Sequence, residues 1–308
     1  MIKEYLNICL LIFLAVSVSY NSGSKEKKQK RELKSSDKPE EKLSDVAMTP
    51  EDTLIFVSVV EWAQTTKLTE KSLDSVIIEV ALFFQGSPYV ANTLEQEGPE
   101  QLVVNLREFD CATYVESVLA LSFCISSGDM TFSDFLRELQ SLRYRHGVID
   151  QYTSRLHYYS EWIVNNQNKG LLKVVSEDFG DEDFEIHVNF MSNNPEKYPT
   201  LADNPEFVEK ISGFEGQISK ETFKMVSEEE IENVQNQIRN GDIIAFTSGI
   251  EGLDILHLGF AIHTGEGELR FIHASTNGNK VRISEKILSE YVHQRKDCPG
   301  IIVVRPVS

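Results

Sequence analysis

The sequence contains few cysteines. There are four, and three of them, Cys111, Cys124 and Cys298, lie outside the apolar segment at the start of the chain. An odd number of thiols cannot all pair within one chain, so a disulfide scaffold is not expected and at least one thiol should stay free. Because a free thiol is a liability in an oxidising compartment, we expect one of the three to have a chemical function.

Positive charge is also scarce. Lysine and arginine contribute 30 residues against 48 aspartates and glutamates, which gives a formal net charge of -18. Residues 21–42 contain more basic than acidic side chains, so the remainder of the chain is more acidic still. So acidic a domain repels phosphate groups, and no nucleic-acid partner is expected.

Long hydrophobic runs are missing except at the start. The apolar run from Tyr5 to Val18 follows Lys3 and is shorter than the roughly 20 residues of a spanning helix. This pattern predicts a secretory signal peptide at residues 1–19, with an uncleaved anchor as the alternative. We therefore expect a periplasmic or secreted protein without a membrane span once the signal is removed. Residues 20–47 then form a flexible charged linker, and residues 48–308 form a single domain.

Three helices are predicted in the first half of that domain. Thr49 and Pro50 begin one that runs to about Ala63, and apolar residues from Leu73 to Phe84 follow the helical repeat of a second. A third extends from Cys111 to about Ile125, with Asp110 as its N-cap. Cys124 lies among apolar neighbours in this helix and is expected in the core. Cys111 lies in the first turn, where the helix dipole favours an anion, so a lowered thiol pKa is expected.

The last part of the chain predicts strands. Residues 243–246, 256–263, 269–274 and 301–304 are short apolar runs, and residues 264–268 resemble a hairpin turn. Together these features predict an α+β fold in which the cysteine helix packs on an antiparallel sheet. A long insertion, about residues 143–240, separates the two. Its cluster around Arg155, His157 and Tyr158 suits a substrate groove, although packing explains it about as well.

Two histidines can meet on the predicted hairpin. His257, Gly259 and Ala261 share one face of their strand, because side chains alternate. A hairpin loop with an odd number of residues, such as 264–266, pairs His263 with Gly267 and places His257 opposite His273, whereas an even loop places them on opposite faces. Satisfied or solvent-exposed histidines are the alternative.

These residues allow nucleophilic catalysis. His257 would take the proton of the Cys111 thiol, and His273 would orient the His257 ring. Backbone N–H groups at the helix start would stabilise the oxyanion. A zinc site formed by Cys111, His257 and His273 is the chemical rival, but paired ligand spacing is lacking, and no cofactor is expected.

Five segments carry a family resemblance. They are Pro88-Tyr89, Phe109-Asp110-Cys111, Gly241-Asp242 with the apolar residues 243–246, His257-Leu258-Gly259-Phe260 and Ile272-His273-Ala274. In this order they make the chain similar to the NlpC-type, papain-like cell-wall peptidase superfamily, over about residues 73–124 and 241–284. Ala112 departs from the serine that commonly follows the cysteine, Ala91-Asn92 replaces a common glycine pair, and the insertion is long.

The resemblance implies roles for individual residues. It implies a papain-like core with Cys111 as nucleophile, His257 as base and His273 as the third polar residue. Tyr89 would assist substrate or oxyanion binding. We place Asp110 in the substrate-binding set with Tyr89, and we add Arg155, His157 and Tyr158 from their location in the insertion.

The insertion also suggests a subgroup. The segments Arg155-Leu156-His157-Tyr158-Tyr159 and Asn189-Phe190-Met191-Ser192 resemble the N-acetylmuramoyl-L-alanine amidase-like subgroup. This resemblance implies hydrolysis of the amide between muramic acid and L-alanine in (anhydro-)muropeptides of cell-wall turnover, by a protein expected to be a monomer. The alternatives are a γ-D-glutamyl-diamino-acid endopeptidase and an inactive cell-wall-binding module. The complete set of Cys111, His257 and His273 argues against the inactive module.

Overall fold

A computed structural model describes residues 46–265 and 267–307. The expected signal peptide, and the expected linker up to residue 45, lie outside this range. The last two linker residues do not behave as expected, because Val46–Ala47 form strand β1 and pair in parallel with β2, Leu102–Val103. The boundary predicted at residue 47 is therefore too late, since backbone pairing already orders the chain at Val46.

Helices dominate the first half of the described chain. The α-helices are α2 (Pro50–Thr65), α3 (Leu73–Phe83), α4 (Cys111–Ser127), α5 (Phe132–Arg143), α6 (Tyr159–Asn168), α7 (Phe190–Asn193), α8 (Pro199–Ala202), α9 (Pro205–Ile218), α10 (Ile231–Val234) and α11 (Leu288–His293). The three helices predicted from sequence correspond to α2, α3 and α4. Gly86 follows the second with φ +97°, a conformation that favours glycine and stops the helix.

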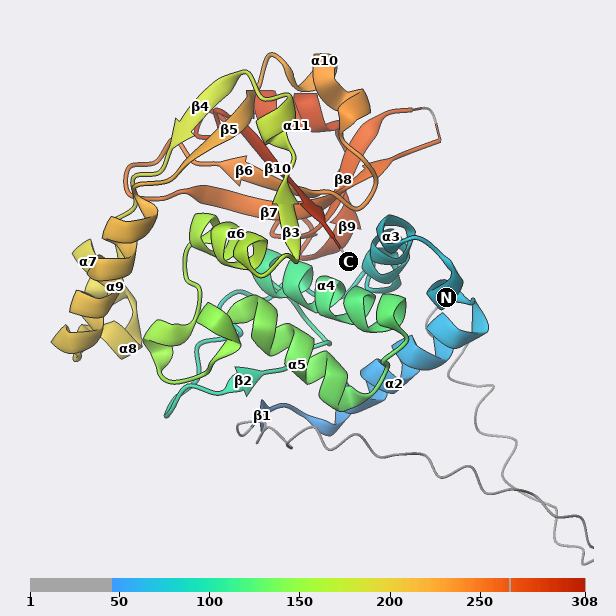
Figure 1. The fold of residues 1–308 in the computed structure, drawn as a ribbon, viewed down its shortest axis with the longest axis horizontal. Coiled ribbons are helices and arrows are strands. Elements are labelled where there is room, and N and C mark those ends of the chain that lie inside the picture. Colours follow the sequence, from blue (N-terminus) through green and yellow to red (C-terminus); the bar gives the residue numbers. More distant parts are fainter. Residues whose placement is uncertain (1–45, 266, 308) are drawn as a thin grey trace, which may run out of the picture. The chain divides into compact units, whose positions relative to one another are not determined.

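The second half supplies most of the strands. They are β3 (Leu172–Val174), β4 (Glu182–Glu185), β5 (Thr222–Ser227), β6 (Ile243–Thr247), β7 (Ile255–His263), β8 (Leu269–Ser275), β9 (Lys280–Ile283) and β10 (Gly300–Pro306). They form an eight-stranded sheet in the order β4-β5-β10-β6-β7-β8-β9, with β3 also paired to β10 (Figure 1). Every pairing in it is antiparallel. A mixed fold of helices and an antiparallel sheet is thus confirmed.

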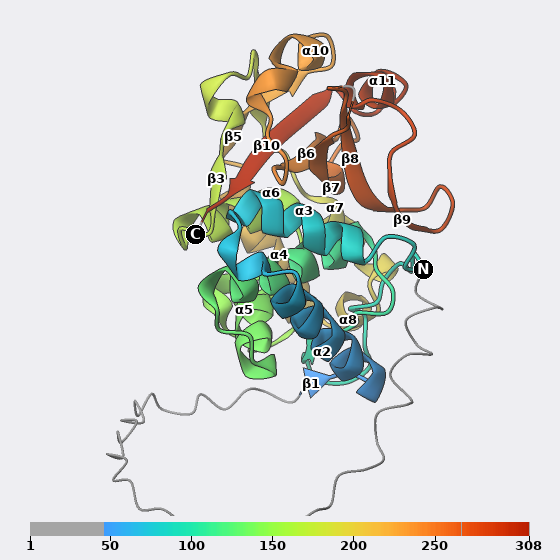
Figure 2. The same ribbon diagram turned by 90° about the vertical axis from the view of Figure 1, so that its right-hand side faces the viewer.

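The sheet has a core on each face. On one face, Leu258, Phe260 and Ile272 pack with the helical layer that contains α3, α4 and α5. On the other face, Ala261 and Phe271 pack with a smaller cluster that includes Leu288 and Val292 of α11. Figure 2 shows the helical layer below the strands and α11 above them. The strand alternation expected for residues 256–263 is realised for Leu258, Phe260 and Ala261, whereas Leu256, expected on the face of Leu258, packs with the α11 cluster next to an irregularity in the β6–β7 pairing.

Helix α4 lies at the centre of the helical layer. Every residue from Thr113 to Ile125 is buried, including Cys124 as expected. The sequence predicts one buried stripe, but α5 covers the side of the helix that the sheet leaves free, so the helix is buried on all sides. Buried Glu116 accepts a 2.7 Å bond from Arg143 of α5, which also donates to the Val103 carbonyl. This buried ion pair fixes the helix that begins at Cys111.

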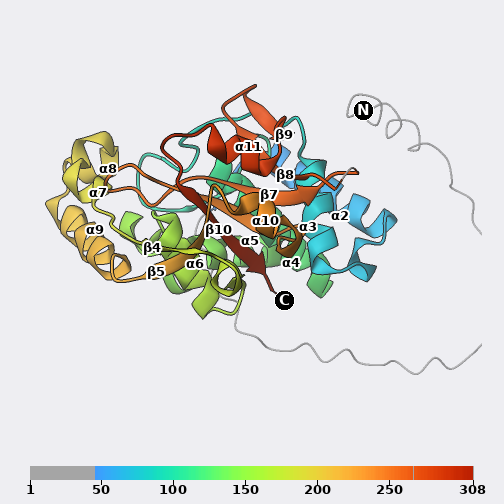
Figure 3. The same ribbon diagram turned by 90° about the horizontal axis from the view of Figure 1, so that it is seen from above.

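The region expected to be an insertion contributes to the sheet itself. Its strands β3 and β5 both pair with β10, and β4 extends the sheet beyond β5. Helices α7, α8 and α9 gather at one end of the domain, away from α2 and α3 (Figure 3). The strands of residues 143–240 were not predicted because two of them, β3 and β5, pair with the last strand of the chain, and β4 pairs with β5 in turn. Within the described part of the chain, no helix has both the length and the apolar character that crossing a membrane requires.

Candidate functional site

The start of α4 fixes the position of Cys111. The Asp110 carboxylate accepts 2.8 Å bonds from the backbone N–H and the hydroxyl of Thr113, whose hydroxyl oxygen accepts a bond from the Asp110 N–H. This reciprocal cap holds Cys111 as the first helical residue, where backbone N–H groups have no partner within the helix. Asp110 therefore has a clear structural role, since its carboxylate caps the helix that carries the thiol.

Tyr89 lies beside this helix start. Its flanking residues pair with Phe109, through bonds from Val90 N–H to the Phe109 carbonyl and from Phe109 N–H to the Pro88 carbonyl. Burial raises the pKa of the Tyr89 hydroxyl, and the nearby Cys111 side chain and Asp110 carboxylate raise it further. The phenol therefore stays protonated near the thiol, where it can act as a hydrogen-bond donor.

A second tyrosine, Tyr159, touches the thiol. Its hydroxyl lies 3.5 Å from the Cys111 sulfur. Tyr159 is the first residue of α6, and the buried Asp254 carboxylate accepts a 2.7 Å bond from the next N–H, that of Ser160. Asp254 also accepts a bond from the Ile255 N–H at the start of β7. Sequence reasoning did not include Tyr159 among the site residues, although it directly follows Tyr158 in the segment 155–159.

The two histidines meet, but in a register that differs from the expected one. His263 pairs with Leu269 and Ala261 with Phe271, so β8 is shifted by two residues from the predicted pairing of His263 with Gly267. A shift by two keeps each side chain on its face. His257 and His273 thus become diagonal neighbours on one face, and the His257 Nε2 lies 2.5 Å from the His273 Nδ1. The prediction that the hairpin loop has an odd number of residues is confirmed. The prediction that His257 lies directly opposite His273 is wrong.

Glycine at position 259 makes this contact possible. Gly259 lies two residues after His257 in β7. A Cβ at this position would come within 2.9 Å of the Phe271 ring and 3.1 Å of the His273 Cβ, both in β8. The Phe271 ring in turn packs against His273 with ring centroids 4.4 Å apart. The absence of a side chain at 259 therefore lets the His273 ring lean over β7 toward His257.

The thiol is protonated at rest, contrary to expectation. Burial raises the pKa of Cys111 to about 11, and the Asp110 carboxylate adds to the increase. Bonds from the Tyr159 hydroxyl and from the N–H of Leu258 and of Cys111 itself act in the opposite direction and are weaker. The prediction of a lowered thiol pKa is therefore wrong, because it considered the helix dipole and omitted burial beside a carboxylate.

Both imidazoles are neutral. Burial lowers the pKa of His257 well below its usual value, with further lowering by His273 and Arg295. Burial, Arg282 and Arg295 lower the pKa of His273 to about 3. A neutral imidazole can accept a proton, so a neutral thiol with a neutral base describes the resting site. Among the described residues no hydrogen bond joins the thiol to His257, but the Leu258 N–H that reaches the thiol follows His257 directly in β7.

The other three expected site residues lie elsewhere. Buried Arg155 pairs with Glu95 at 2.6 Å and donates to the Leu94 carbonyl. His157 Nε2 bonds the Tyr152 carbonyl at 2.9 Å. Tyr158 is 5% exposed, donates to Glu215 at 2.7 Å and accepts from the Met191 N–H. These side chains are occupied by partners within the protein, and none of these bonds involves Cys111, His257 or His273.

The histidine pair is arranged for proton transfer. The two ring nitrogens face each other across a hydrogen bond, which is unlike two ligands that converge on one ion. Within the described residues no group of three or more His, Cys, Asp or Glu side chains could hold a metal. A thiol at a helix start and two neutral imidazoles are groups that acyl transfer can use.

The chain is similar to a family of amidases and to several solved structures. Residues 79–301 match the family model described as AmiA-like, N-acetylmuramoyl-L-alanine amidase-like. A crystal structure of an N-acetylmuramoyl-L-alanine amidase from Bacteroides uniformis is 35% identical with a TM-score of 0.74, over 77% of this chain and 99% of that one. A Bacteroides fragilis protein provisionally named a xylanase is 39% identical with a TM-score of 0.71, over 74% and 99% of the two chains.

A more distant structure shares the fold. A protein from Legionella pneumophila is 24% identical with a TM-score of 0.63, over 83% of this chain and 96% of that one. No curated protein is similar enough to count as a match. The family match spans most of the described chain and includes Cys111, His257 and His273. This chain therefore belongs to the AmiA-like, N-acetylmuramoyl-L-alanine amidase-like family of hydrolases.

Proposed function

We propose that this protein is a cysteine amidase that cuts the bond between the lactyl group of muramic acid and L-alanine in (anhydro-)muropeptides. The observation that carries the proposal is the half-buried Cys111 at the start of α4, next to strand β7, whose His257 pairs with His273 of β8. In its arrangement of a helix-borne thiol and strand-borne imidazoles, the site follows the papain-like scheme.

The tautomer of His257 decides which of its nitrogens is the base. We assign the proton to His257 Nε2, which faces His273 Nδ1, and this leaves the His257 Nδ1 free as the base. That nitrogen removes the thiol proton as the sulfur attacks the lactyl carbonyl carbon. The Cys111 backbone N–H and the hydroxyls of Tyr89 and Tyr159 are the donors available to the oxyanion.

Collapse of the tetrahedral intermediate completes the first half. The carbon–nitrogen bond breaks, and His257 returns its proton to the leaving nitrogen of L-alanine. Water, deprotonated by the same imidazole, then attacks the thioester and releases the lactyl carboxylate and the thiol. His273 stabilises the charged His257 ring in both halves through the nitrogen contact.

Glycoside hydrolysis fits the site less well, despite the name of the Bacteroides fragilis structure. Glycosidases generally use two carboxyl groups on either side of the scissile bond. The Asp110 carboxylate beside the thiol caps α4, and the Asp254 carboxylate, which bonds the N–H after Tyr159, caps α6, so both are engaged. With the signal-like residues 1–19 we propose that the amidase acts in the periplasm or after secretion.

A defined muropeptide tests the proposal. The wild-type protein should release the L-alanyl peptide from an anhydro-muropeptide, and mass spectrometry should find the cleaved lactyl amide. Cys111→Ala should lower kcat by at least about a thousandfold, since loss of a nucleophile leaves only binding and electrostatic effects.

Cys124→Ala is the matched control, because this buried thiol has no bond to the site and its removal should retain activity. A product cut after D-glutamate would replace the proposed bond by the endopeptidase alternative. Equal activity of wild type and Cys111→Ala would rule out the thiol as nucleophile.

A further inference from the structure

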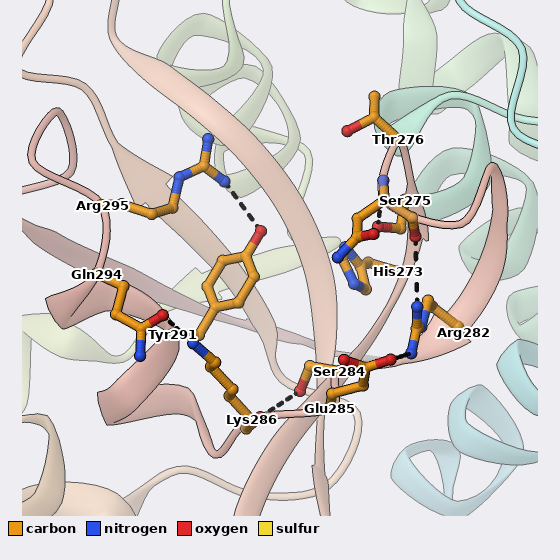
Figure 4. A pocket seen from close by; sticks show the side chains of 11 residues that line it. His273, Ser275, Thr276, Arg282, Ser284, Glu285, Lys286, Tyr291, Gln294 and Arg295 are labelled. Atoms are coloured by element: carbon orange, nitrogen blue, oxygen red, sulfur yellow. Dashed lines mark hydrogen bonds and ion pairs between the residues drawn. The ribbon is translucent and has the colours of Figure 1, made fainter.

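A cavity of about 370 Å³ opens beside His273 on the α11 face of the sheet. Figure 4 shows side chains from β8 and β9 on one side of it and side chains from α11 and the residues just after α11 on the other. His273 is 3% exposed and lines the cavity, while its Nδ1 faces His257. The cavity therefore borders the proton-transfer pair directly.

The cavity is lined by positive charge. Arg282, Lys286 and Arg295 contribute three cations, and Glu285 is the single carboxylate among the lining residues. Glu285 pairs with Arg282. Such an excess of cations contrasts with a chain whose net charge is -18, and it favours an anionic ligand at this place.

Two of the three cations have only neutral partners. Arg295 donates a 2.9 Å bond to the Tyr291 hydroxyl, and the Lys286 ammonium bonds the Gln294 side chain (Figure 4). Within residues 46–265 and 267–307, neither Lys286 nor Arg295 has a carboxylate within ion-pair distance. Both can therefore give charge-assisted bonds to a ligand carboxylate.

The chemistry of the leaving group decides which part of a substrate reaches this cavity. A general acid must lie within hydrogen-bond reach of the nitrogen that it protonates, so the groups attached to that nitrogen extend on the histidine side. For the proposed bond, this group is the L-alanyl peptide, which continues into D-glutamate and carries free carboxylates. The sugar side has none, because its lactyl carboxyl group is part of the scissile amide.

We propose that the cavity lined by Lys286, Arg295 and Arg282 is a subsite for a carboxylate of the leaving stem peptide. The inference rests on the proposed amidase function and deepens it. It assigns the acyl side, with the sugar, to the region of Cys111, Tyr89 and Tyr159. Specificity for acidic peptides then arises on the far side of the histidine pair from the thiol.

Two substrates, one with carboxylates on its stem peptide and one without them, test this subsite. We would compare N-acetylmuramoyl-L-alanyl-D-glutamate with the analogue in which both carboxyl groups of the D-glutamate are carboxamides. Wild type should show a KM about tenfold to a hundredfold lower for the acid, because one or two charge-assisted bonds are lost with the amide. In Arg295→Gln and Lys286→Gln, the KM for the acid should rise toward that for the amide while kcat changes little.

Lys296→Gln is the matched control, since this exposed lysine does not line the cavity and should keep full discrimination. Equal KM values for both substrates in wild type would overturn the subsite and leave the amidase function intact. If wild type hydrolyses neither substrate, the amidase function fails, and calorimetry of Cys111→Ala with L-alanyl-D-glutamate and its diamide decides the subsite. Tighter binding of the acid, lost in Arg295→Gln, would support it, and equal or absent binding would overturn it.

Discussion

Cys111 combines a reactive position with a high proton affinity. Its helix start and the nearby N–H groups stabilise a thiolate, yet burial and Asp110 outweigh them and hold the thiol pKa at about 11. The catalytic thiolate therefore forms only as His257 accepts the proton. The resting site therefore holds a neutral thiol and a neutral imidazole in place of a preformed thiolate–imidazolium pair, and the two become charged during the reaction.

Alkylation of Cys111 by iodoacetamide should follow this high pKa. A group with a raised pKa is protonated throughout the neutral range, so the alkylation rate should keep rising with pH beyond 9 and reach no plateau near neutrality. Peptide mapping would locate the label and separate Cys111 from buried Cys124 and Cys298. A plateau below pH 8 would instead indicate a thiolate–imidazolium pair at rest.

At the scale of elements, Asp254 connects strand β7, which carries His257, to helix α6, which carries Tyr159. Its carboxylate accepts bonds from Ser160 in α6 and from Ile255 in β7, and so fixes Tyr159 relative to His257. We regard Asp254 as a positioning residue, because its carboxylate bonds these backbone groups and acts on the thiol through Tyr159.

Asp254→Ala should lower both stability and turnover. Two buried N–H groups lose their acceptor, which costs about 1–3 kcal/mol in the free energy of unfolding. The Tyr159 hydroxyl should also lose its fixed position, so kcat should fall more than KM changes. Urea denaturation and steady-state kinetics would measure both. Asp203→Ala, at an exposed aspartate without a side-chain bond among the described residues, should be neutral, and an unchanged kcat for Asp254→Ala would contradict the positioning role.

At the scale of the whole molecule, residues 143–240 are integrated into the fold. Their strands extend the sheet through β10, and Tyr158 joins α6 to α7 and α9 through Met191 and Glu215. This arrangement explains the polar and aromatic character of the segment, for which sequence reasoning left a substrate groove and packing as alternatives.

Tyr158→Phe separates packing from substrate binding. Loss of the hydroxyl leaves buried Glu215 without this donor, so the free energy of unfolding should fall by about 1–3 kcal/mol while KM stays constant. Thermal or urea unfolding and the muropeptide assay would give the two values. Tyr198→Phe is a nearby control, because the Tyr198 hydroxyl has no hydrogen bond among the described residues. A large KM increase with unchanged stability would restore Tyr158 to the substrate-binding set.

Local patterns determined much of this protein. Caps and apolar spacing predicted α2, α3 and α4 and placed Cys111 at a helix start, and strand alternation put both histidines on one face for a hairpin loop with an odd number of residues. These features depend on neighbours in sequence, so the sequence contains them. Only the tertiary structure decided the two-residue shift of the hairpin, the contact of Tyr159 with the thiol, the burial that raises the thiol pKa, and the basic cavity beside His273. Each of these depends on segments far apart in the chain, whose distances and desolvation no local pattern encodes.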